Sequence, residues 1–252
     1  MMIQDFFQKR NRIALAFSGG ADSAFLLSVG KQSGCDIYPY YVKTPFQTQI
    51  EIDNAQYLAD VIGVPLKTLQ FDVLSLPNIV HNKNDRCYHC KHSIFKIIKS
   101  AAYAVGCEMI IDGTNASDDI NDRPGMQALR ELGVRSPLRE CGLSKSQIRE
   151  ASRQIGLSTW NKPANACLAT RIPIGTPIKY ETLQKVEQAE NYLSGLGFSD
   201  FRVRVFHEGA KIQLLETQFD QVCAMRLDIL NHLSQYFNEI FIDLHCRNQS
   251  KE

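Results

Sequence analysis

The 252-residue sequence contains no apolar run that approaches the roughly 18 residues a membrane-spanning helix needs. Its N-terminal segment has only short apolar stretches, and its basic residues follow Phe6 and Phe7, so it does not resemble a signal peptide. The charge also lacks an excess of either sign, because 28 Lys and Arg oppose 27 Asp and Glu. A net charge of +1 argues against tight binding to a nucleic-acid backbone. We therefore expect a cytoplasmic protein with no membrane partner and no nucleic-acid partner.

The alternation of short apolar runs with helical segments predicts an α/β fold with a doubly wound parallel sheet over residues 1–157. The expected strands are 12–17, 36–42, 66–71 and 108–113, and the expected helices are 24–32, 47–62, 88–105 and 144–155. Residues 114–125 are polar and contain Gly and Pro, which predicts a loop. No internal repeat is present.

The pattern changes after residue 157. Residues 158–179 have little periodicity and several prolines, which predicts a linker. Residues 180–252 then predict a smaller α+β domain. Its expected elements are a helix at 180–196, strands at 201–206 and 211–216, a helix at 218–236 and a strand at 239–244.

A glycine-rich turn, S-G-G-A-D-S at residues 18–23, follows the first expected strand and precedes a helix. Consecutive glycines let backbone N–H groups turn toward one anion, and the hydroxyls of Ser18 and Ser23 add donors. The turn lacks the G-K-[ST] of a Walker A loop and the spacing of a dinucleotide-binding loop. It matches the pyrophosphate-loop (PP-loop) signature of ATP pyrophosphatases, in which Asp22 would help to hold magnesium. The alternative is an ordinary strand–helix turn that tolerates glycine.

Only one C-x-x-C pair, Cys87 and Cys90, occurs among eight cysteines, whereas a zinc ribbon needs two pairs. Disulfides are not expected in a reducing compartment. Zinc bound with help from His89 or His92, or a redox role, remains an alternative for the pair. The cysteines outside the motifs are expected to be mostly core residues. They are Cys35, Cys107, Cys141, Cys223 and Cys246.

With the turn, four further stretches make the chain resemble the LarE family of ATP-dependent sulfur transferases. They are residues 85–91; residues 112–115 with Asp119 and residues 121–125; residues 161–164 with 167–171; and residues 196–198 with 202–204. The resemblance implies that ATP adenylates a carboxylate of a pyridinium dicarboxylate mononucleotide. A cysteine-bound sulfur would then displace AMP to give a thiocarboxylate for the nickel-pincer nucleotide cofactor. It also implies an adenine nucleotide alpha-hydrolase-like fold, and we expect a homo-oligomer.

The resemblance implies these roles residue by residue. ATP and its pyrophosphate, with Mg²⁺, would bind at Ser18, Gly19, Gly20, Asp22, Ser23, Thr44 and Gly113. Cys167 and Asp22 would be catalytic, and Arg171, Arg202 and Arg204 would bind the phosphate of the substrate. An exposed strand face is the alternative explanation for the last two arginines. Gln213 stands where the family often has an acidic residue, which argues against a metal site in the second domain.

The cysteines distinguish two branches of the family. One branch has a single working cysteine, at the position of Cys167, and sacrifices its sulfur. The other has three cysteines that resemble ligands of a [4Fe-4S] cluster, and this sequence matches all three with Cys87, Cys90 and Cys167. Three thiolates leave one iron open, which suits a transferable sulfide. The alternatives from other classes are a tRNA thiolase, an amide-forming ligase and a nucleotide-binding sensor.

Overall fold

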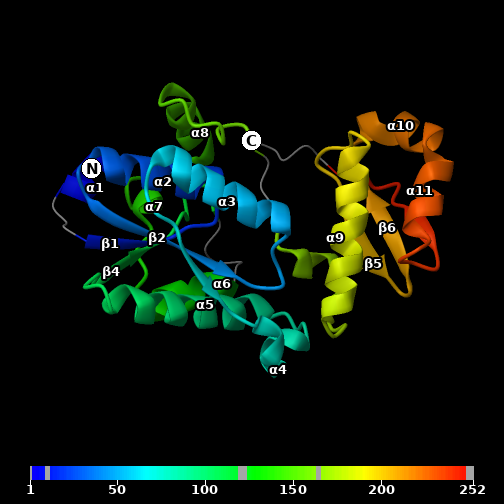
Figure 1. Ribbon diagram of the computed structural model, residues 1–252, viewed down its shortest axis with the longest axis horizontal. Helices are drawn as coiled ribbons and strands as arrows, with labels where there is room; N and C mark the ends of the chain where they lie inside the picture. The colour runs from blue at the N-terminus through cyan, green and yellow to red at the C-terminus, as the bar shows by residue number, and fades with distance from the viewer. Residues whose placement is uncertain (1, 9–11, 119–123, 163–165, 248–252) are drawn as a thin grey trace. The chain divides into compact units, whose positions relative to one another are not determined.

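The computed structural model describes residues 2–8, 12–118, 124–162 and 166–247, and these form two compact units (Figure 1). The first unit comprises residues 1–73 and 85–165, and the second comprises residues 74–84 and 166–252. Some of the family-like residues named above, Asp119, residues 121–123 and residues 163–164, lie outside the described residues.

A four-stranded parallel sheet in the order β3-β2-β1-β4 forms the centre of the first unit. Its strands are β1 (Arg12–Ala16), β2 (Asp36–Lys43), β3 (Lys67–Gln70) and β4 (Met109–Ile111). The pairing of Leu15 with Ile111 and of Ala16 with Tyr40 brings the carboxyl ends of three strands to one edge of the sheet. In parallel α/β sheets this edge is where ligands bind.

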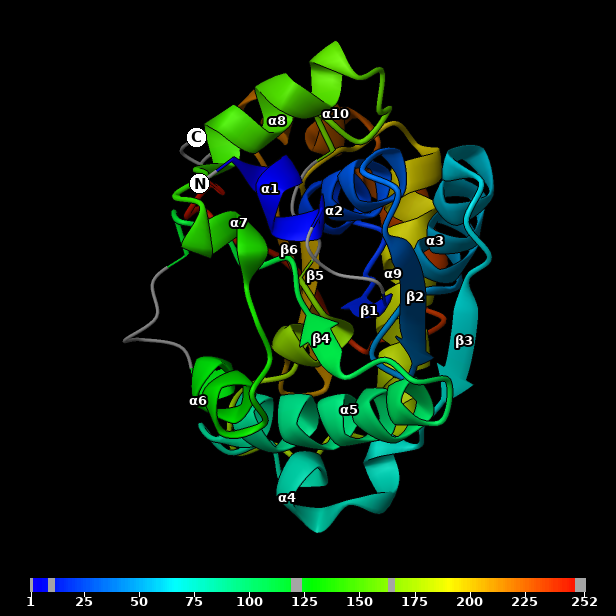
Figure 2. The same ribbon diagram turned by 90° about the vertical axis from the view of Figure 1, so that its left-hand side faces the viewer.

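Helices cover both faces of this sheet (Figure 2). One face carries α1 (Ile3–Gln8), α2 (Ala21–Gln32), α3 (Gln49–Ile62), α7 (Pro137–Glu140) and α8 (Lys145–Gln154), and the other carries α5 (Arg86–Tyr103) and α6 (Pro124–Glu131). Within β1, Ile13 and Leu15 pack into the first layer and Ala14 into the second, as the alternation of a strand requires. The doubly wound parallel sheet predicted from the sequence is confirmed.

Local signals explain where two of these helices begin. Thr48 and Glu51 form a capping box at the start of α3, and Ser144 and Gln147 form another at the start of α8. The helix at residues 144–155 is therefore found close to its predicted bounds. The prediction of a loop over residues 114–125 is wrong at its end, because α6 already begins at Pro124, a residue whose fixed φ suits the first turn of a helix.

The second unit combines α9 (Tyr180–Gly195) with a three-stranded sheet in the order β5-β6-β7. Its strands are β5 (Arg202–Phe206), β6 (Gly209–Gln213) and β7 (Ile240–Ile242); the first pair is antiparallel and the second parallel. The short helices α4 (Pro77–Val80) and η2 (Leu168–Arg171) belong to the same unit. A smaller α+β part after the parallel sheet is thus confirmed.

The prediction of a single helix over residues 218–236 is wrong. The structure has a turn η3 (Glu216–Gln218), then α10 (Phe219–Ala224) and α11 (Arg226–Leu233), with a break at Met225. The buried Val222, Ile229 and Leu233 keep helical spacing across the break, so the sequence pattern does not reveal it. No helix among the described residues is both long and apolar enough to cross a membrane.

Candidate active site

The glycine-rich turn between β1 and α2 is folded around its two serine hydroxyls. Ser23 Oγ donates to the carbonyl oxygen of Gly20 (3.1 Å) and accepts from the backbone N–H of Ser18 (3.3 Å). Gly19 has φ +69°, and a Cβ there would lie 2.9 Å from the Cβ of Ala55 on α3, so a larger residue does not fit. Gly20 caps α2 without a side-chain bond, so the first N–H groups of this helix are available to an anion.

Asp22 lies where the loops after β1 and β4 meet. A Cβ on Gly113 would be 3.3 Å from the Cβ of Asp22, and Asn115 Nδ2 donates to Asp22 Oδ2 at 3.4 Å. Burial raises the pKa of Asp22; the hydrogen bond from Asn115 opposes this shift, and so do the charges of Lys145 and Arg149. A partly buried carboxylate short of compensating charge is suited to a divalent cation that also binds phosphate oxygens.

Thr44 follows β2 at the same edge of the sheet, but its side chain is used within its own turn. Its hydroxyl donates to Gln47 Oε1 (3.0 Å) and accepts from the backbone N–H of Phe46 (3.1 Å), and the residue is buried. The structure therefore brings Ser18, Ser23, Asp22 and Gly113 together, whereas Thr44 shapes a neighbouring loop.

The C-x-x-C pair occupies the first two turns of α5. Cys87 is the second residue of the helix and is exposed, and Cys90 follows three residues later on the same side. The buried Arg86 donates from Nη2 to Cys87 Sγ at 3.5 Å, so a guanidinium adjoins this sulfur.

The histidines proposed for a zinc alternative have other neighbours. His89 Nε2 lies 3.3 Å from Asp85 Oδ2, and His92 stacks on Tyr88. Among the residues that the structure describes, no group of three or more His, Cys, Asp or Glu could hold a metal ion. Thiolates are the ligands that iron–sulfur clusters need. Cys87 and Cys90 lie in the first unit and Cys167 in the second, so the [4Fe-4S] cluster stays a prediction.

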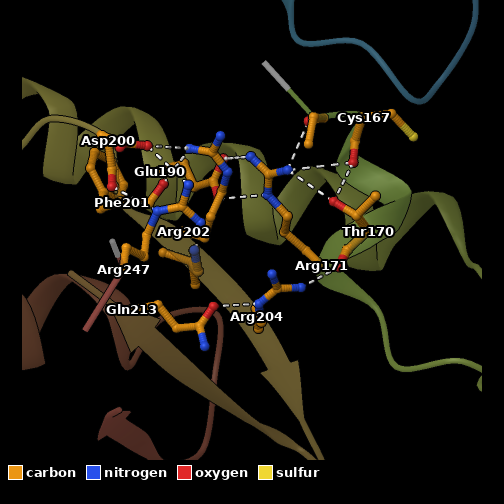
Figure 3. A network of polar contacts seen from close by, with 12 residues as sticks. Cys167, Thr170, Arg171, Glu190, Asp200, Phe201, Arg202, Arg204, Gln213 and Arg247 are labelled. Carbon is orange, nitrogen blue, oxygen red and sulfur yellow. Dashed lines mark hydrogen bonds and ion pairs between the residues drawn. The ribbon is translucent and has the colours of Figure 1, made fainter. Parts of the chain in front are cut away.

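Cys167 is the residue before η2, and its backbone carbonyl accepts several hydrogen bonds (Figure 3). The carbonyl oxygen accepts from the N–H (2.9 Å) and the hydroxyl (2.8 Å) of Thr170. Arg171 Nη1 donates to the same oxygen (3.4 Å) and to the carbonyl oxygen of Ala166 (2.7 Å). The turn that presents the sulfur is thus closed by the side chains of its own last two residues.

Four guanidinium groups gather around two carboxylates beside this turn (Figure 3). Arg171 pairs with Glu190, and Arg247 pairs with Asp200 (3.0 Å), from which Arg202 lies 3.9 Å away. Arg204 donates to Gln213 Oε1 (2.5 Å) and to the carbonyl oxygen of Thr170 (2.6 Å). We call Arg171, Arg202, Arg204 and Arg247 the arginine cluster.

The four positive charges of the arginine cluster outnumber the two negative charges of the carboxylates that pair with them, those of Glu190 and Asp200. Burial lowers the pKa of Arg202 and of Arg204, and the charges of Arg171 and Arg247 lower both further. The repulsion among these four like charges would be relieved by an anion with several oxygens, such as a phosphate. Arg202 and Arg204 alternate along β5 and are half-buried, while Val203 between them is in the core, so these arginines are not on a freely exposed strand face.

Sequence reasoning missed Arg247 and Glu190. Glu190 lies on the apolar stripe of α9 formed by Leu183, Val186 and Leu193. A carboxylate at a core position of a helix was the available signal, because such a group needs a buried partner. Arg247 gave no such signal, since it follows the last strand in an irregular segment.

Comparison with known proteins adds independent information. No family model matches the chain. An uncharacterized protein of Synechocystis is 36% identical over 244 residues, which cover 96% of this chain and 91% of that protein. The pyridinium-3,5-bisthiocarboxylic acid mononucleotide synthase of Lactiplantibacillus plantarum is 32% identical over 209 residues, 82% of this chain and 76% of the synthase. The chain belongs to the LarE family of ATP-dependent sulfur transferases.

More distant relatives agree with this assignment. A tRNA-specific 2-thiouridylase, MnmA, of Clostridium botulinum is 23% identical over 185 residues, which cover 61% of this chain and 52% of that enzyme. The LarE-family chain is accordingly an enzyme that transfers sulfur with the use of ATP, on a PP-loop fold. The roles of its individual residues stay predictions.

Proposed function

We propose that this enzyme adenylates a carboxylate of a pyridinium dicarboxylate mononucleotide and replaces the AMP by sulfur, giving a thiocarboxylate for the nickel-pincer nucleotide cofactor. The observation that carries the proposal is that Cys167 and the arginine cluster share one hydrogen-bond network, through Arg171 and Arg204. A sulfur source beside a multivalent anion site suits a small phosphorylated substrate. The similarity to the Lactiplantibacillus plantarum synthase supports the same substrate class.

The first step belongs to the glycine-rich turn. A carboxylate oxygen of the substrate attacks the α-phosphorus of ATP, the bond to the β-phosphate breaks, and an acyl-adenylate and pyrophosphate result. The N–H groups at the start of α2 bind the leaving pyrophosphate. Asp22 would hold the magnesium ion of the pyrophosphate, and Lys145 and Arg149, whose charges act on Asp22, would compensate the growing negative charge.

The second step belongs to the turn at Cys167. A sulfur nucleophile adds to the acyl carbon, and the bond to the AMP oxygen then breaks, which leaves a thiocarboxylate and AMP. Arg202 and Arg204 bind the phosphate of the mononucleotide, and the positive charge of Arg171 contributes to the attraction. This contact orients the activated carboxylate toward the sulfur.

Cys87, Cys90 and Cys167 would together hold a [4Fe-4S] cluster, which supplies a sulfide at its open iron when it is bound. Two of these ligands come from the first unit and one from the second. In the alternative without a cluster, Cys167 gives up its own sulfur and becomes dehydroalanine. The mass of the chain would then fall by about 34 Da, the mass of the H₂S lost.

The test is an anaerobic reaction of the purified enzyme with ATP, Mg²⁺ and the pyridinium dicarboxylate mononucleotide. We expect AMP and pyrophosphate in equal amounts, and a product in which sulfur replaces one carboxylate oxygen. The dephosphorylated nucleoside is the matched control, and it should react far more slowly at the same concentration. If the enzyme thiolated a tRNA and formed no thiocarboxylate from the mononucleotide, it would be a tRNA thiolase and the proposal would be wrong.

A further inference from the structure

The ion pair between Arg171 and Glu190 is the most deeply buried one that the structure describes in the second unit. The side chains are 6% and 13% exposed, and they meet in a parallel fork, with Nε to Oε1 at 2.9 Å and Nη2 to Oε2 at 3.0 Å. The remaining nitrogen, Nη1, reaches the carbonyl oxygens of Ala166 and Cys167 and the hydroxyl of Thr170. The guanidinium therefore links Glu190, through Nε and Nη2, to the turn that carries Cys167, through Nη1.

Glu190 is itself fixed to β5. Its Oε1 also accepts a hydrogen bond from the backbone N–H of Val203 at 2.9 Å. Val203 lies between Arg202 and Arg204, and Arg204 donates directly to the carbonyl oxygen of Thr170 at 2.6 Å. Strand β5 thus holds both ends of the turn, one end through Glu190 and Arg171 and the other through Arg204 (Figure 3).

Burying two charges costs free energy that an apolar pair of similar size would not cost, so a buried ion pair needs a reason beyond stability. Here the reason is geometric, because a side-on carboxylate fixes the plane of a guanidinium and so fixes where its third nitrogen points. A lysine in place of Arg171 could keep the charge, but it could not make the hydrogen bonds of all three guanidinium nitrogens at once.

We propose that Glu190 and Arg171 are positioning residues, which lock the turn of Cys167 at a fixed distance from Arg202 and Arg204. The inference rests on the proposed function, since the distance matters only if the arginines bind one end of the substrate and sulfur is delivered to the other. It gives Arg171 a task different from direct contact with the substrate phosphate, and the two tasks predict different kinetics.

Glu190→Gln is the deciding variant. It keeps the size of the side chain and its bond to Val203, but it cannot form the charged fork. The rate of thiocarboxylate formation in a single turnover should fall by about tenfold to a hundredfold, the effect of a misplaced reacting group. The KM for the mononucleotide should not rise, because the variant removes a negative charge that lies beside the arginine cluster. If Glu190 only balanced charge, the KM would fall and the rate would stay, which would overturn the inference.

Arg171→Lys separates positioning from phosphate binding. Positioning predicts a similar loss of rate with a KM close to that of the wild type. A rise in KM as large as that of Arg202→Ala, with an unchanged rate, would instead make Arg171 a ligand of the phosphate. Thr170→Val is a milder variant for the case that a buried charge substitution does not fold. It removes the hydroxyl that links Arg171 to the Cys167 carbonyl and should lower the rate by about threefold to tenfold.

The chain offers a matched control on α8. Arg153 and Glu150 form the same two-bond fork, at 3.0 Å and 3.0 Å, but their side chains are 58% and 50% exposed. Glu150→Gln and Arg153→Lys should leave the rate and the KM unchanged. A loss in these variants equal to that of Glu190→Gln would show a general effect of charge and would contradict positioning.

A second readout does not need the substrate. Iodoacetamide labelling followed by peptide mass spectrometry gives the rate of alkylation of Cys167, with the exposed Cys223 as an internal reference. Glu190→Gln should change the Cys167 rate by about threefold or more relative to Cys223, because the turn is released. If labelling changes while the wild type makes no thiocarboxylate, the proposed function fails and positioning of the turn stands. If labelling and transfer both equal those of the wild type, the inference is wrong.

Discussion

The two candidate anion sites of this enzyme use different chemical groups, backbone N–H groups in one and charged side chains in the other. The turn at residues 18–23 offers backbone N–H groups at the start of α2, and its only acidic side chain is Asp22, the proposed magnesium ligand. The arginine cluster offers charged side chains carried by η2, β5 and the segment after β7. We call the turn at residues 18–23 the backbone site and the arginine cluster the side-chain site. The backbone site is fixed as soon as β1 and α2 form. The side-chain site depends on the buried partners of its arginines.

This difference fits two tasks. Every reaction uses the same pyrophosphate group, so a site made of backbone can be shared by relatives as distant as a tRNA thiouridylase. The relative acts on tRNA, whereas a mononucleotide is proposed here, so we expect the acceptor site to be made of side chains that can change one at a time. Gln213 illustrates the point, since it donates to Asp243 (2.7 Å) and accepts from Arg204, and its neutral amide keeps the arginine cluster positive.

The largest effect is expected at the cysteines proposed to hold the [4Fe-4S] cluster. Cys87→Ala should remove the iron and acid-labile sulfide of an anaerobic preparation and abolish repeated turnover, since two thiolates cannot hold the cluster. Iron analysis and product counts per chain measure both. Cys223→Ala, which removes an exposed cysteine on α10, is the control and should retain iron. Full turnover by iron-free Cys87→Ala would disprove the cluster and leave the sulfur-transferase assignment intact.

Asp22→Ala should break the backbone site alone. Without the carboxylate proposed to hold magnesium, release of pyrophosphate should fall by about a hundredfold to a thousandfold. Circular dichroism should remain that of the wild type, because Asp22 is only partly buried and contributes little to packing. Asp53→Ala, on the exposed side of α3, is the matched control. Wild-type pyrophosphate release from Asp22→Ala would remove the turn from the active site.

Arg202→Ala and Arg204→Ala should weaken the side-chain site and spare the backbone site. Each removes a charge-assisted contact worth about 1.5–3 kcal/mol, so the KM for the mononucleotide should rise by roughly tenfold to a hundredfold. The KM for ATP should change little. Lys211→Ala removes a positive charge from the strand beside Arg204, but Lys211 pairs with Asp243, so this control should have a small effect. Equal losses for ATP and substrate would place the arginines elsewhere in the mechanism.

The same contrast explains what could be predicted from the sequence. The parallel sheet and the turn at residues 18–23 follow from contiguous signals, namely an apolar strand, two glycines and a helix. Two capping boxes likewise mark the starts of α3 and α8. Local chemistry decides such features, so they can be seen without knowledge of the tertiary structure.

The arginine cluster could be predicted only in part. Arg202 and Arg204 share one strand and were visible as an alternating pair. Glu190 and Arg247 come from a helix and a terminal segment, and their roles depend on tertiary packing that no sequence window contains. The break at Met225 was hidden for a different reason, because the local apolar spacing continues through it.

The smallest expected effect concerns stability at the backbone site. Burial raises the pKa of Asp22 above its usual 3.8, so the folded chain binds this proton more tightly than the unfolded chain does. The carboxyl therefore favours folding at low pH, and this contribution is lost as the pH rises through the raised pKa. At pH 7 the ionised carboxylate costs stability, and Asp22→Asn removes that cost.

Without ligand, Asp22→Asn should accordingly melt a few degrees above the wild type at pH 7, and the difference should shrink as the pH falls toward 3.8. With saturating Mg²⁺ and ATP the order should reverse, because only the wild type gains the binding energy of the magnesium complex. Asp53→Asn, on an exposed helix face, should follow the wild type in both conditions. If Asp22→Asn melted below the wild type in the absence of ligand, the carboxylate would stabilise the folded turn without a bound cation. The backbone site would then resemble the arginine cluster, whose charges already have partners inside the protein.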